Sequence, residues 1–222
     1  MHFLITAGPT REWLDPVRFL SNPSSGKMGY ALAQAARETG ATVTLISGPV
    51  TLAAPRGVEL VRVETAAEMA REVIWRAKRA DAVILSAAVA DWTPATRARQ
   101  KMKKEAGGKR KATLVLTLKP TVDIAATIGK SLRPGQVLVG FAAETQRVEA
   151  NAKEKLRRKN FDLIVANDVS RPGVGFGSDR NEIIIIGRDD DVERPRRASK
   201  LALARRILKR ACAMRAAKLE RS

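Results

Sequence analysis

The sequence predicts an α/β fold, a Rossmann-like three-layer αβα arrangement with a mainly parallel sheet. Short apolar runs alternate with segments of helical periodicity along most of the chain. Most of these runs are short and apolar on both faces, which is typical of parallel strands covered by helices on each side. With 222 residues the chain is long enough for a substantial core, and we expect one domain over residues 1–222.

Six apolar runs are predicted to be the strands of this sheet. They cover residues 3–7, 42–47, 59–63, 81–88, 137–140 and 162–166. Four amphipathic stretches between them are predicted to be helices, over residues 27–39, 66–79, 122–130 and 148–159. Thr65 and Glu68 have the spacing of a capping box at the start of the second helix, and Gly40 fits a stop after the first.

Two segments interrupt this alternation of strands and helices. Residues 97–111 are polar and basic, and residues 112–118 then alternate between apolar and polar like a strand. A second strand-like run, residues 182–186, precedes a charged turn at 188–191. We expect antiparallel additions to the sheet here, carrying a flap (about residues 92–112) or a contact used for dimerisation.

The last part of the chain, about residues 198–218, is predicted to be a basic amphipathic helix. Leu201, Leu203, Ile207 and Leu208 fall on its apolar side. The simplest interpretation is a packing helix whose charged face is solvated.

The chain is strongly basic, with 41 Lys and Arg against 23 Asp and Glu and a formal net charge of +18. Such an excess favours polyanionic partners. The basic residues are nevertheless spread over several helices, a loop and the tail, and no helix-turn-helix or zinc-finger pattern is visible. Aromatic residues are too few for a base-stacking platform. Solvated helix faces and a phosphate-rich substrate explain the charge more simply, and a basic nucleic-acid-binding α/β module is the alternative function.

The sequence predicts a cytoplasmic protein without a membrane segment. No apolar stretch has the length of a membrane helix, and the first residues enter a predicted strand without the features of a signal peptide. Cys212 is the only cysteine, which excludes an internal disulfide and a cysteine-cluster metal site. His2 is the only histidine, so a base that would activate Cys212 as a nucleophile is hard to find.

Residues 22–29 lie between the first predicted strand and the first predicted helix. They place small hydroxyls, a glycine and a lysine at a helix N-terminus, where free N–H groups and the helix dipole favour a phosphate. Four further segments follow predicted strands, at the edge where open α/β sheets bind ligands: Gly8–Thr10, 47–49, 87–91 and 141–144. Each alone is compatible with an ordinary turn. Their shared placement predicts a nucleotide or phosphate site.

The two common nucleotide fingerprints are absent. A Walker loop needs a glycine five residues before its Gly-Lys pair and a Ser or Thr after it, where this chain has Ser21 and Met28. The first turn also lacks the G-x-G-x-x-G pattern, and the second strand ends without the acidic residue of a dinucleotide site.

Several charged side chains are candidates for nucleotide chemistry. The lysines of residues 101–104 form either a solvated charge run or a loop that closes over a triphosphate. Lys155 and Lys159 share a helix face, where like charges repel unless an anion lies between them or they point to water. Asp91 is a strand-end carboxylate suited to Mg²⁺ or to a sugar or base group, or else a turn or N-cap residue.

Nine motifs occur in an order found in one known family. They are ITAGPTRE at 5–12, DPVRF at 15–19, SN at 21–22, SSGKMG at 24–29, AAVAD at 87–91, KMKK at 101–104, GFAAET at 140–145, KN at 159–160 and AND at 166–168. Over about residues 2–210 the chain resembles phosphopantothenoylcysteine synthetase, and its flap is similar to that of the bacterial, CTP-dependent type. Bacterial members are usually fused behind a flavin-dependent decarboxylase, so the chain resembles a standalone enzyme or an excised domain.

The resemblance implies a ligase of coenzyme A biosynthesis that acts in two steps. The carboxylate of 4′-phosphopantothenate attacks the α-phosphorus of CTP, giving an acyl-cytidylate and pyrophosphate. The amine of L-cysteine then attacks the activated carbonyl and expels CMP. Mg²⁺, a homodimer and a phosphopantothenoylcysteine decarboxylase as a separate partner are further implications.

The resemblance also assigns residues. Asn22 resembles the asparagine that binds the acyl-cytidylate and supports the second step, and Lys101 resembles the flap lysine needed to form the intermediate. The chain departs from the family at Val122, which is usually proline, and at Pro23, where a bacterial form has histidine. The predicted cofactor-binding residues are Gly8, Ser24, Ser25, Gly26, Lys27, Ala87, Ala88, Asp91, Lys104, Val122, Asp123, Ile124, Ala125, Phe141, Lys155 and Lys159.

Overall fold

An eight-stranded mixed sheet is the centre of the protein. The computed structural model describes residues 1–103, 114–170, 175 and 177–221. The strand order is β13-β12-β10-β9-β6-β1-β4-β5. From one edge to the other these strands are Val192–Glu193, Ile184–Gly187, Leu163–Asp168, Val137–Glu144, Ala82–Leu85, His2–Ala7, Thr42–Ser47 and Glu59–Arg62. The six strands from β10 to β5 pair in parallel, whereas β12 and β13 are antiparallel additions.

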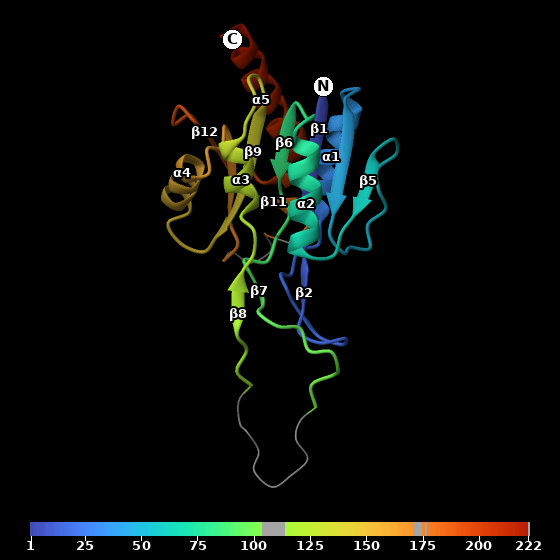
Figure 1. Ribbon diagram of the computed structural model, residues 1–222. Coiled ribbons are helices and arrows are strands. Elements are labelled where there is room, and N and C mark those ends of the chain that lie inside the picture. Colours follow the sequence, from blue (N-terminus) through green and yellow to red (C-terminus); the bar gives the residue numbers. More distant parts are fainter. Residues whose placement is uncertain (104–113, 171–174, 176, 222) are drawn as a thin grey trace.

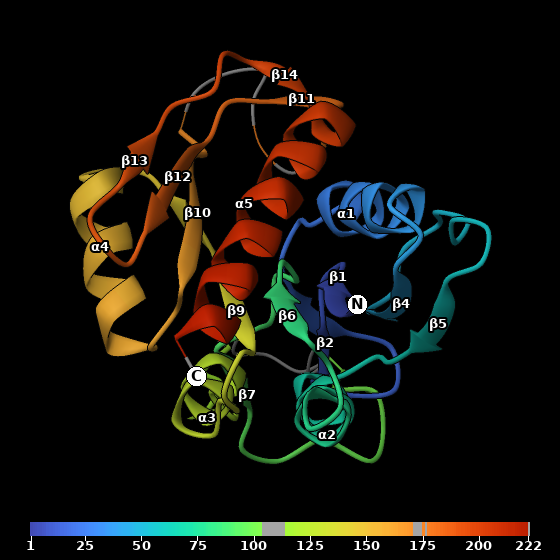
Figure 2. The ribbon, with the colours of Figure 1, turned by 90° about the horizontal axis from the view of Figure 1, so that it is seen from above.

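Helices cover both faces of this sheet, so the predicted three-layer α/β fold is confirmed (Figure 2). Helices α1 (Lys27–Glu38) and α5 (Lys200–Glu220) lie side by side on one face. Helices α2 (Ala66–Ala77), α3 (Ile124–Lys130) and α4 (Val148–Arg158) cover the other. Within the described residues no helix is long and apolar enough to cross a membrane.

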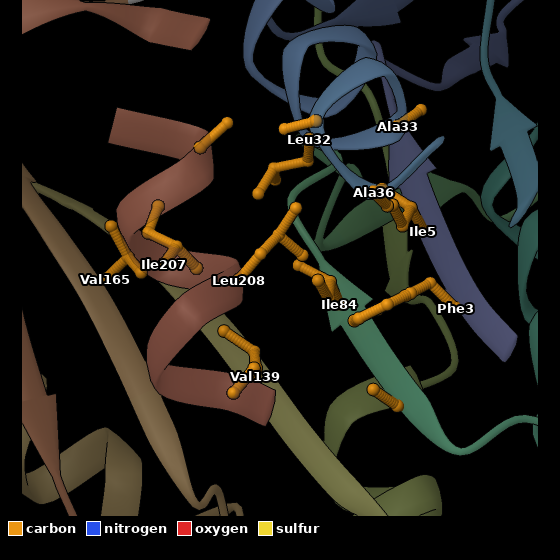
Figure 3. Close-up of a cluster of buried hydrophobic side chains, with 14 of the residues drawn as sticks. Phe3, Ile5, Leu32, Ala33, Ala36, Ile84, Val139, Val165, Ile207 and Leu208 are labelled. Atoms are coloured by element: carbon orange, nitrogen blue, oxygen red, sulfur yellow. The ribbon is translucent and has the colours of Figure 1, made fainter. Parts of the chain in front are cut away.

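Each strand contributes to two cores because successive side chains point to opposite faces. Phe3 and Ile5 of β1 pack with Leu32 of α1 and Leu208 of α5, as Figure 3 shows. Leu4, between them, belongs to the core under α2 and α3. Both cores exclude water from large aliphatic side chains, each contributing about 1.5–3 kcal/mol to folding. This double burial is why the central strands carry apolar side chains toward both faces.

The helix ends follow their predicted caps in two cases. The Thr65 hydroxyl accepts from the Glu68 N–H at 3.2 Å and the Glu68 carboxylate accepts from the Thr65 N–H at 3.2 Å, which completes the capping box of α2. Gly40 follows α1 with φ +78°, as a helix stop requires.

The start of the third helix was predicted too early. Helix α3 begins at Ile124, and its N-cap is Asp123, whose carboxylate accepts from the Ala126 N–H at 2.9 Å. Val122 therefore precedes the helix.

The predicted strand over residues 112–118 is wrong over residues 114–117. Residues 114–117 have no regular structure, and residues 112 and 113 lie outside the described residues. The strand there is β8 (Leu118–Pro120), which pairs with β7 (Trp92–Pro94). Leu114 and Val115 are 64% and 87% exposed, so their alternation has no buried face to fix it.

Short strands extend the structure beyond the main sheet. β7 and β8 project from the edge where the parallel strands end, near the hairpin of β2 (Arg11–Trp13) and β3 (Phe19–Ser21) (Figure 1). A third pair, β11 (Arg180–Asn181) with β14 (Ala198–Ser199), leads into α5. The predicted strand over residues 81–88 is shorter than expected, because β6 ends at Leu85.

The charged face of α5 is largely paired with acidic residues. Arg205 pairs with Glu38 of α1 at 2.8 Å, and Arg215 pairs with Asp81 at 2.8 Å. Arg206 and Arg210 pair with Glu193. The predicted apolar side is confirmed, since Leu203, Ile207 and Leu208 are buried while Leu201 is half-buried. The basic face is therefore partly an ion-paired surface that joins α5 to its neighbours.

The loops after β1 and β4 touch so closely that only glycine fits at position 48. The Gly48 N–H donates to the Ala7 carbonyl at 2.9 Å, and a Cβ on Gly48 would lie 1.7 Å from the Pro9 carbonyl oxygen. We predict that Gly48→Ala lowers the unfolding free energy by about 2 kcal/mol and Tm by about 4–8 °C, because one loop must move. Thermal unfolding followed by circular dichroism measures this.

Gly177→Ala is the matched control, because a Cβ there would meet no atom within 4 Å. An unchanged Tm in Gly48→Ala would mean that the two loops are not in contact.

Candidate functional site

A cavity of about 930 Å³ lies at the carboxyl ends of β6 and β9, beside the N-terminus of α1. Segments far apart in the sequence meet there, as expected for a parallel sheet. Fifteen of the predicted site residues line it. They are Asn22, Ser24, Ser25, Gly26, Lys27, Ala87, Ala88, Asp91, Val122, Asp123, Ile124, Ala125, Phe141, Lys155 and Lys159.

The start of α1 forms one wall of the cavity. Gly26 is the N-cap with φ +75°, and the first turn carries neither a side-chain cap nor an acidic residue. Since no described side chain caps them, the N–H groups that open the helix can donate to a ligand, and the helix dipole adds positive potential. Gly29 brings this end onto the sheet, because a Cβ there would lie 2.5 Å from the Ala7 Cβ.

Gly8 lies behind the lining of the cavity. It is buried with φ +75°, and its carbonyl accepts from the Ala88 N–H at 2.9 Å. A Cβ on Gly8 would lie 3.2 Å from the Gly48 carbonyl oxygen. The structure gives Gly8 a part in fixing residues 87–88, while ligand contact by Gly8 stays a prediction.

Asn22 joins two parts of the cavity. Its side-chain amide donates to the carbonyls of Ala88 and Val89, at 3.1 and 3.3 Å. The amide NH₂ assignment follows from these acceptors. The Asn22 Oδ1 atom receives no hydrogen bond from the described residues, so it is available to accept one from a ligand.

Cationic side chains of α4 form the opposite wall. The Lys155 ammonium donates to the Phe141 carbonyl at 2.9 Å. Burial lowers the pKa of Lys155 below its ordinary value, and the negative charges of Glu144 and Asp91 only partly offset this. Lys159, just after α4, is ion-paired with Asp123. An anion bound at this wall would favour the charged form of Lys155.

Asp123 has a structural role in addition to its position in the cavity. Burial opposes the charged carboxylate, yet its hydrogen bonds from Lys159 and from the Ala126 N–H hold its pKa below the usual range. The residue therefore remains an anion that positions Lys159 and caps α3.

The flap lysines are not among the cavity-lining residues. Lys101 is exposed, and Lys104 lies outside the described residues. The neighbouring residue Met102 is held by a buried carboxylate, since its N–H donates to Asp15 at 3.1 Å and its carbonyl accepts from Arg18 at 2.5 Å. A role for Lys101 and Lys104 in binding a ligand stays a prediction.

Asp15 holds the start of the flap in place, a role that was not predicted from the sequence, although the residue lies in the DPVRF motif. Burial opposes its charge, but hydrogen bonds from Val17, Arg18 and Met102 hold its pKa well below the usual range. It therefore fixes the base of the flap to the loop before β3. The spacing of Asp15 and Arg18, three residues apart, was the available signal.

Of the three carboxylates that line the cavity, Asp91 and Glu144 have the chemistry to hold Mg²⁺, whereas Asp123 is paired with Lys159. Asp91 is exposed and its carboxylate receives no hydrogen bond from the described residues, while Glu144 accepts from Asn151 at 3.0 Å. The described residues contain no group of three or more possible metal ligands. This donor set fits Mg²⁺ that is shared with substrate phosphates, because Mg²⁺ at such sites uses one or two carboxylates.

The polar lining residues that were not predicted include Arg158, Asn181 and Lys200. Arg158 is one turn from Lys155 on α4, so helical spacing could have found it. Asn181 and Lys200 reach the cavity through the pairing of β11 with β14. That pairing joins short strands and leaves no pattern in the sequence.

The arrangement suits a polyanion of nucleotide size. Ammonium and guanidinium groups, an open helix N-terminus and backbone groups at strand ends surround a volume at the upper end of ordinary ligand sites. Carboxylates sit beside the cations, so a metal ion and a phosphate chain can be bound together.

Comparison with known proteins places this geometry in a family. Residues 1–214 match the family described as the DNA/pantothenate metabolism flavoprotein C-terminal domain. The coenzyme A biosynthesis bifunctional protein CoaBC of Bacillus subtilis (strain 168) is 50% identical over 222 residues, which is 100% of this chain and 53% of that protein. A cysteine/cysteine sulfinic acid decarboxylase from an unknown prokaryotic organism is 47% identical over 86% of this chain and 52% of its own length.

A solved structure has the same fold. It is the crystal structure of the C-terminal domain of a coenzyme A biosynthesis bifunctional protein CoaBC. It is 42% identical with a TM-score of 0.81, over 100% of this chain and 96% of the crystallised one. The chain thus spans about half the length of the curated relatives it matches and nearly all of this crystallised domain.

The lowered pKa of Lys155 gives a prediction for the protein without ligands. Below about pH 10.4 the unfolded chain holds this proton more firmly than the folded one, so wild-type stability should rise as the pH approaches that value. We predict that Lys155→Met stabilises the fold relative to wild type, and that this advantage is larger at pH 7 than at pH 10. Urea unfolding at both pH values measures the difference.

Lys209→Met, which removes an exposed ammonium of α5, is the control and should show no such change with pH. An advantage of Lys155→Met that stays constant or grows toward pH 10 would contradict the assignment.

Proposed function

The chain belongs to the family of the DNA/pantothenate metabolism flavoprotein C-terminal domain, and from this membership we propose that it joins 4′-phosphopantothenate to L-cysteine, using CTP, in coenzyme A biosynthesis. One observation carries the proposal. Motif residues between positions 22 and 159 that match this ligase reaction come together around one cationic cavity. The relatives' names support the pathway, since two-domain proteins of coenzyme A biosynthesis share half of their length with this chain.

The first proposed step forms the acyl-cytidylate. A carboxylate oxygen of 4′-phosphopantothenate attacks the α-phosphorus of CTP, the bond to the β-phosphate oxygen breaks, and pyrophosphate leaves. The step brings a carboxylate against a polyanion, so the site must supply positive charge. Lys155, Lys159 and Arg158 are placed to do so. Mg²⁺, held by Asp91 or Glu144 together with phosphate oxygens, would neutralise further charge when bound.

The second proposed step forms the amide. The cysteine amine attacks the activated carbonyl, gives up a proton, and CMP leaves with the electrons of the broken bond. Asn22 is proposed to support this step, because its amide NH₂ is fixed on the Ala88 and Val89 carbonyls and its Oδ1 accepts no hydrogen bond from the described residues. An acceptor oxygen at this place can hold an N–H of the incoming amine or of the cytidylate.

The flap, about residues 92–112, is proposed to contribute a further cation. Lys101 is exposed in the free protein and would supply positive charge when the flap closes over the triphosphate. A homodimer is proposed to form through the antiparallel pair of β7 and β8, where Trp92 is 54% and Leu118 is 36% exposed. A phosphopantothenoylcysteine decarboxylase, fused or separate, would supply the next reaction.

The decisive experiment measures pyrophosphate release from CTP, ATP, GTP and UTP, each with and without 4′-phosphopantothenate. We expect release from CTP only when 4′-phosphopantothenate is present, and amide formation when L-cysteine is added. Salt-sensitive binding of DNA or RNA without any pyrophosphate release would instead support the nucleic-acid-binding alternative.

Asn22→Asp separates the two steps. We expect the variant to release pyrophosphate at a rate within a few fold of wild type but to form product about 100-fold more slowly, because the fixed amide is lost. Single-turnover assays with labelled CTP, with and without L-cysteine, measure both steps. Gln146→Glu, which makes the same amide-to-carboxylate change at an exposed position outside the cavity lining, is the control. Normal product formation by Asn22→Asp would remove Asn22 from the mechanism.

A further inference from the structure

Helices α1 and α5 both begin at one end of the cavity. They lie side by side on the same face of the sheet (Figure 2), and the first residue of each is a lysine. Lys27 and Lys200, here called the lysine pair, line the cavity and also a neighbouring open groove of about 780 Å³. The lysine pair is on the face opposite α4, which carries Lys155 and Arg158. The cavity therefore has cations on two separate walls.

Lys200 is held rigidly at the cavity. It is only 6% exposed, and its ammonium donates to the Gly175 carbonyl, also in the lining, at 3.0 Å. Its backbone N–H donates to the Asp179 carbonyl at 3.0 Å, next to the pairing of β11 with β14. Burial and the charge of Lys27 both lower the pKa of Lys200 below its ordinary value. An anion beside this ammonium is therefore favoured.

Lys27 is held by residues on the groove side of the lysine pair. Its ammonium donates to the Asp179 carboxylate at 2.6 Å and to the Gly177 carbonyl at 3.0 Å. Asp179 and the lysine pair line the open groove, but Asp179 does not line the cavity. The Asp179 side chain is 86% exposed, and water screens an ion pair so open to solvent, so the pair holds Lys27 only weakly. A stronger anion inside the cavity can displace Asp179 at little cost.

We propose that the lysine pair binds the phosphate group of 4′-phosphopantothenate, and that Lys27 moves from Asp179 to this phosphate when the substrate enters. The inference rests on the proposed function and names the end of the cavity that takes the acid substrate. A phosphate monoester carries a charge of about −1.5 to −2 at pH 7, which matches two ammonium groups better than one carboxylate does. The uncapped start of α1 adds N–H donors beside Lys27.

The two cationic walls then divide the ligands between them. The phosphate and the carboxylate are at opposite ends of 4′-phosphopantothenate. A phosphate held at the lysine pair directs the carboxylate toward the middle of the cavity, while CTP phosphates lie against the α4 wall. Two polyanions are thus kept apart except at the reacting atoms.

Binding of 4′-phosphopantothenate without CTP tests the proposal by titration calorimetry, and pantothenate is the probe that lacks the phosphate. We expect Lys200→Met to weaken 4′-phosphopantothenate binding about 10- to 100-fold while leaving pantothenate binding unchanged. Asp179→Asn should tighten 4′-phosphopantothenate binding about 2- to 5-fold, because Lys27 is released. Lys209→Met is the control for charge on the same helix and should bind like wild type.

Two results would overturn the proposal: Lys200→Met binding 4′-phosphopantothenate within 2-fold of wild type, or an equal loss for pantothenate. If Lys200→Met fails to fold, the exposed Asp179→Asn variant decides, and no gain in affinity would then overturn it. If wild type releases pyrophosphate but Lys200→Met binds 4′-phosphopantothenate as wild type does, the phosphate site is refuted and the ligase function stands. If 4′-phosphopantothenate binding depends on Lys200 but wild type releases no pyrophosphate, the ligase function is refuted and the phosphate site stands.

Discussion

The whole site depends on one constraint, a six-stranded parallel sheet that has to be buried on both faces. Parallel neighbours end at the same edge, so turns from distant parts of the sequence must meet there. The helix after the first strands begins at that edge, which places the open N-terminus of α1 in the cavity. Close loop packing at Gly8 and Gly48, and of Gly29 on β1, makes this edge dense enough to hold fixed backbone groups.

Acidic residues decide where the large positive charge of the chain acts. On α5 most of the basic face is used internally, since Arg205, Arg210 and Arg215 each pair with a carboxylate of another element. In the cavity, Lys155 and Lys200 donate hydrogen bonds to the carbonyl oxygens of Phe141 and Gly175, which lack the full negative charge of a carboxylate. The net charge of +18 is thus a poor guide to function. The kind of partner that each ammonium group has, a carboxylate or a carbonyl, is a better guide.

The sequence predicted those parts of the structure that rest on local rules. Short runs that are apolar on both faces predicted the parallel strands, and the capping-box spacing of Thr65 and Glu68 predicted the start of α2. The prediction of a strand over residues 112–118 failed because an alternation of apolar and polar residues specifies a strand only where one face is buried. Leu114 and Val115 are exposed to water instead. Lys200 was missed for a related reason: its place in the cavity results from pairing between β11 and β14, which is non-local and only two residues long.

Burial of ammonium groups links stability to function in this cavity. The folded protein without ligands carries Lys155 and Lys200 with lowered pKa values, so each charge is less stable there than in water. Anionic ligands remove this penalty and bind only the folded state, so they stabilise the protein as they bind. Because the two lysines lie on walls formed by helices from opposite faces of the sheet, two anionic ligands can each relieve one of them. A reaction between two anions needs this separation, since a single cationic cluster would bind both at one place and leave the reacting atoms unpositioned.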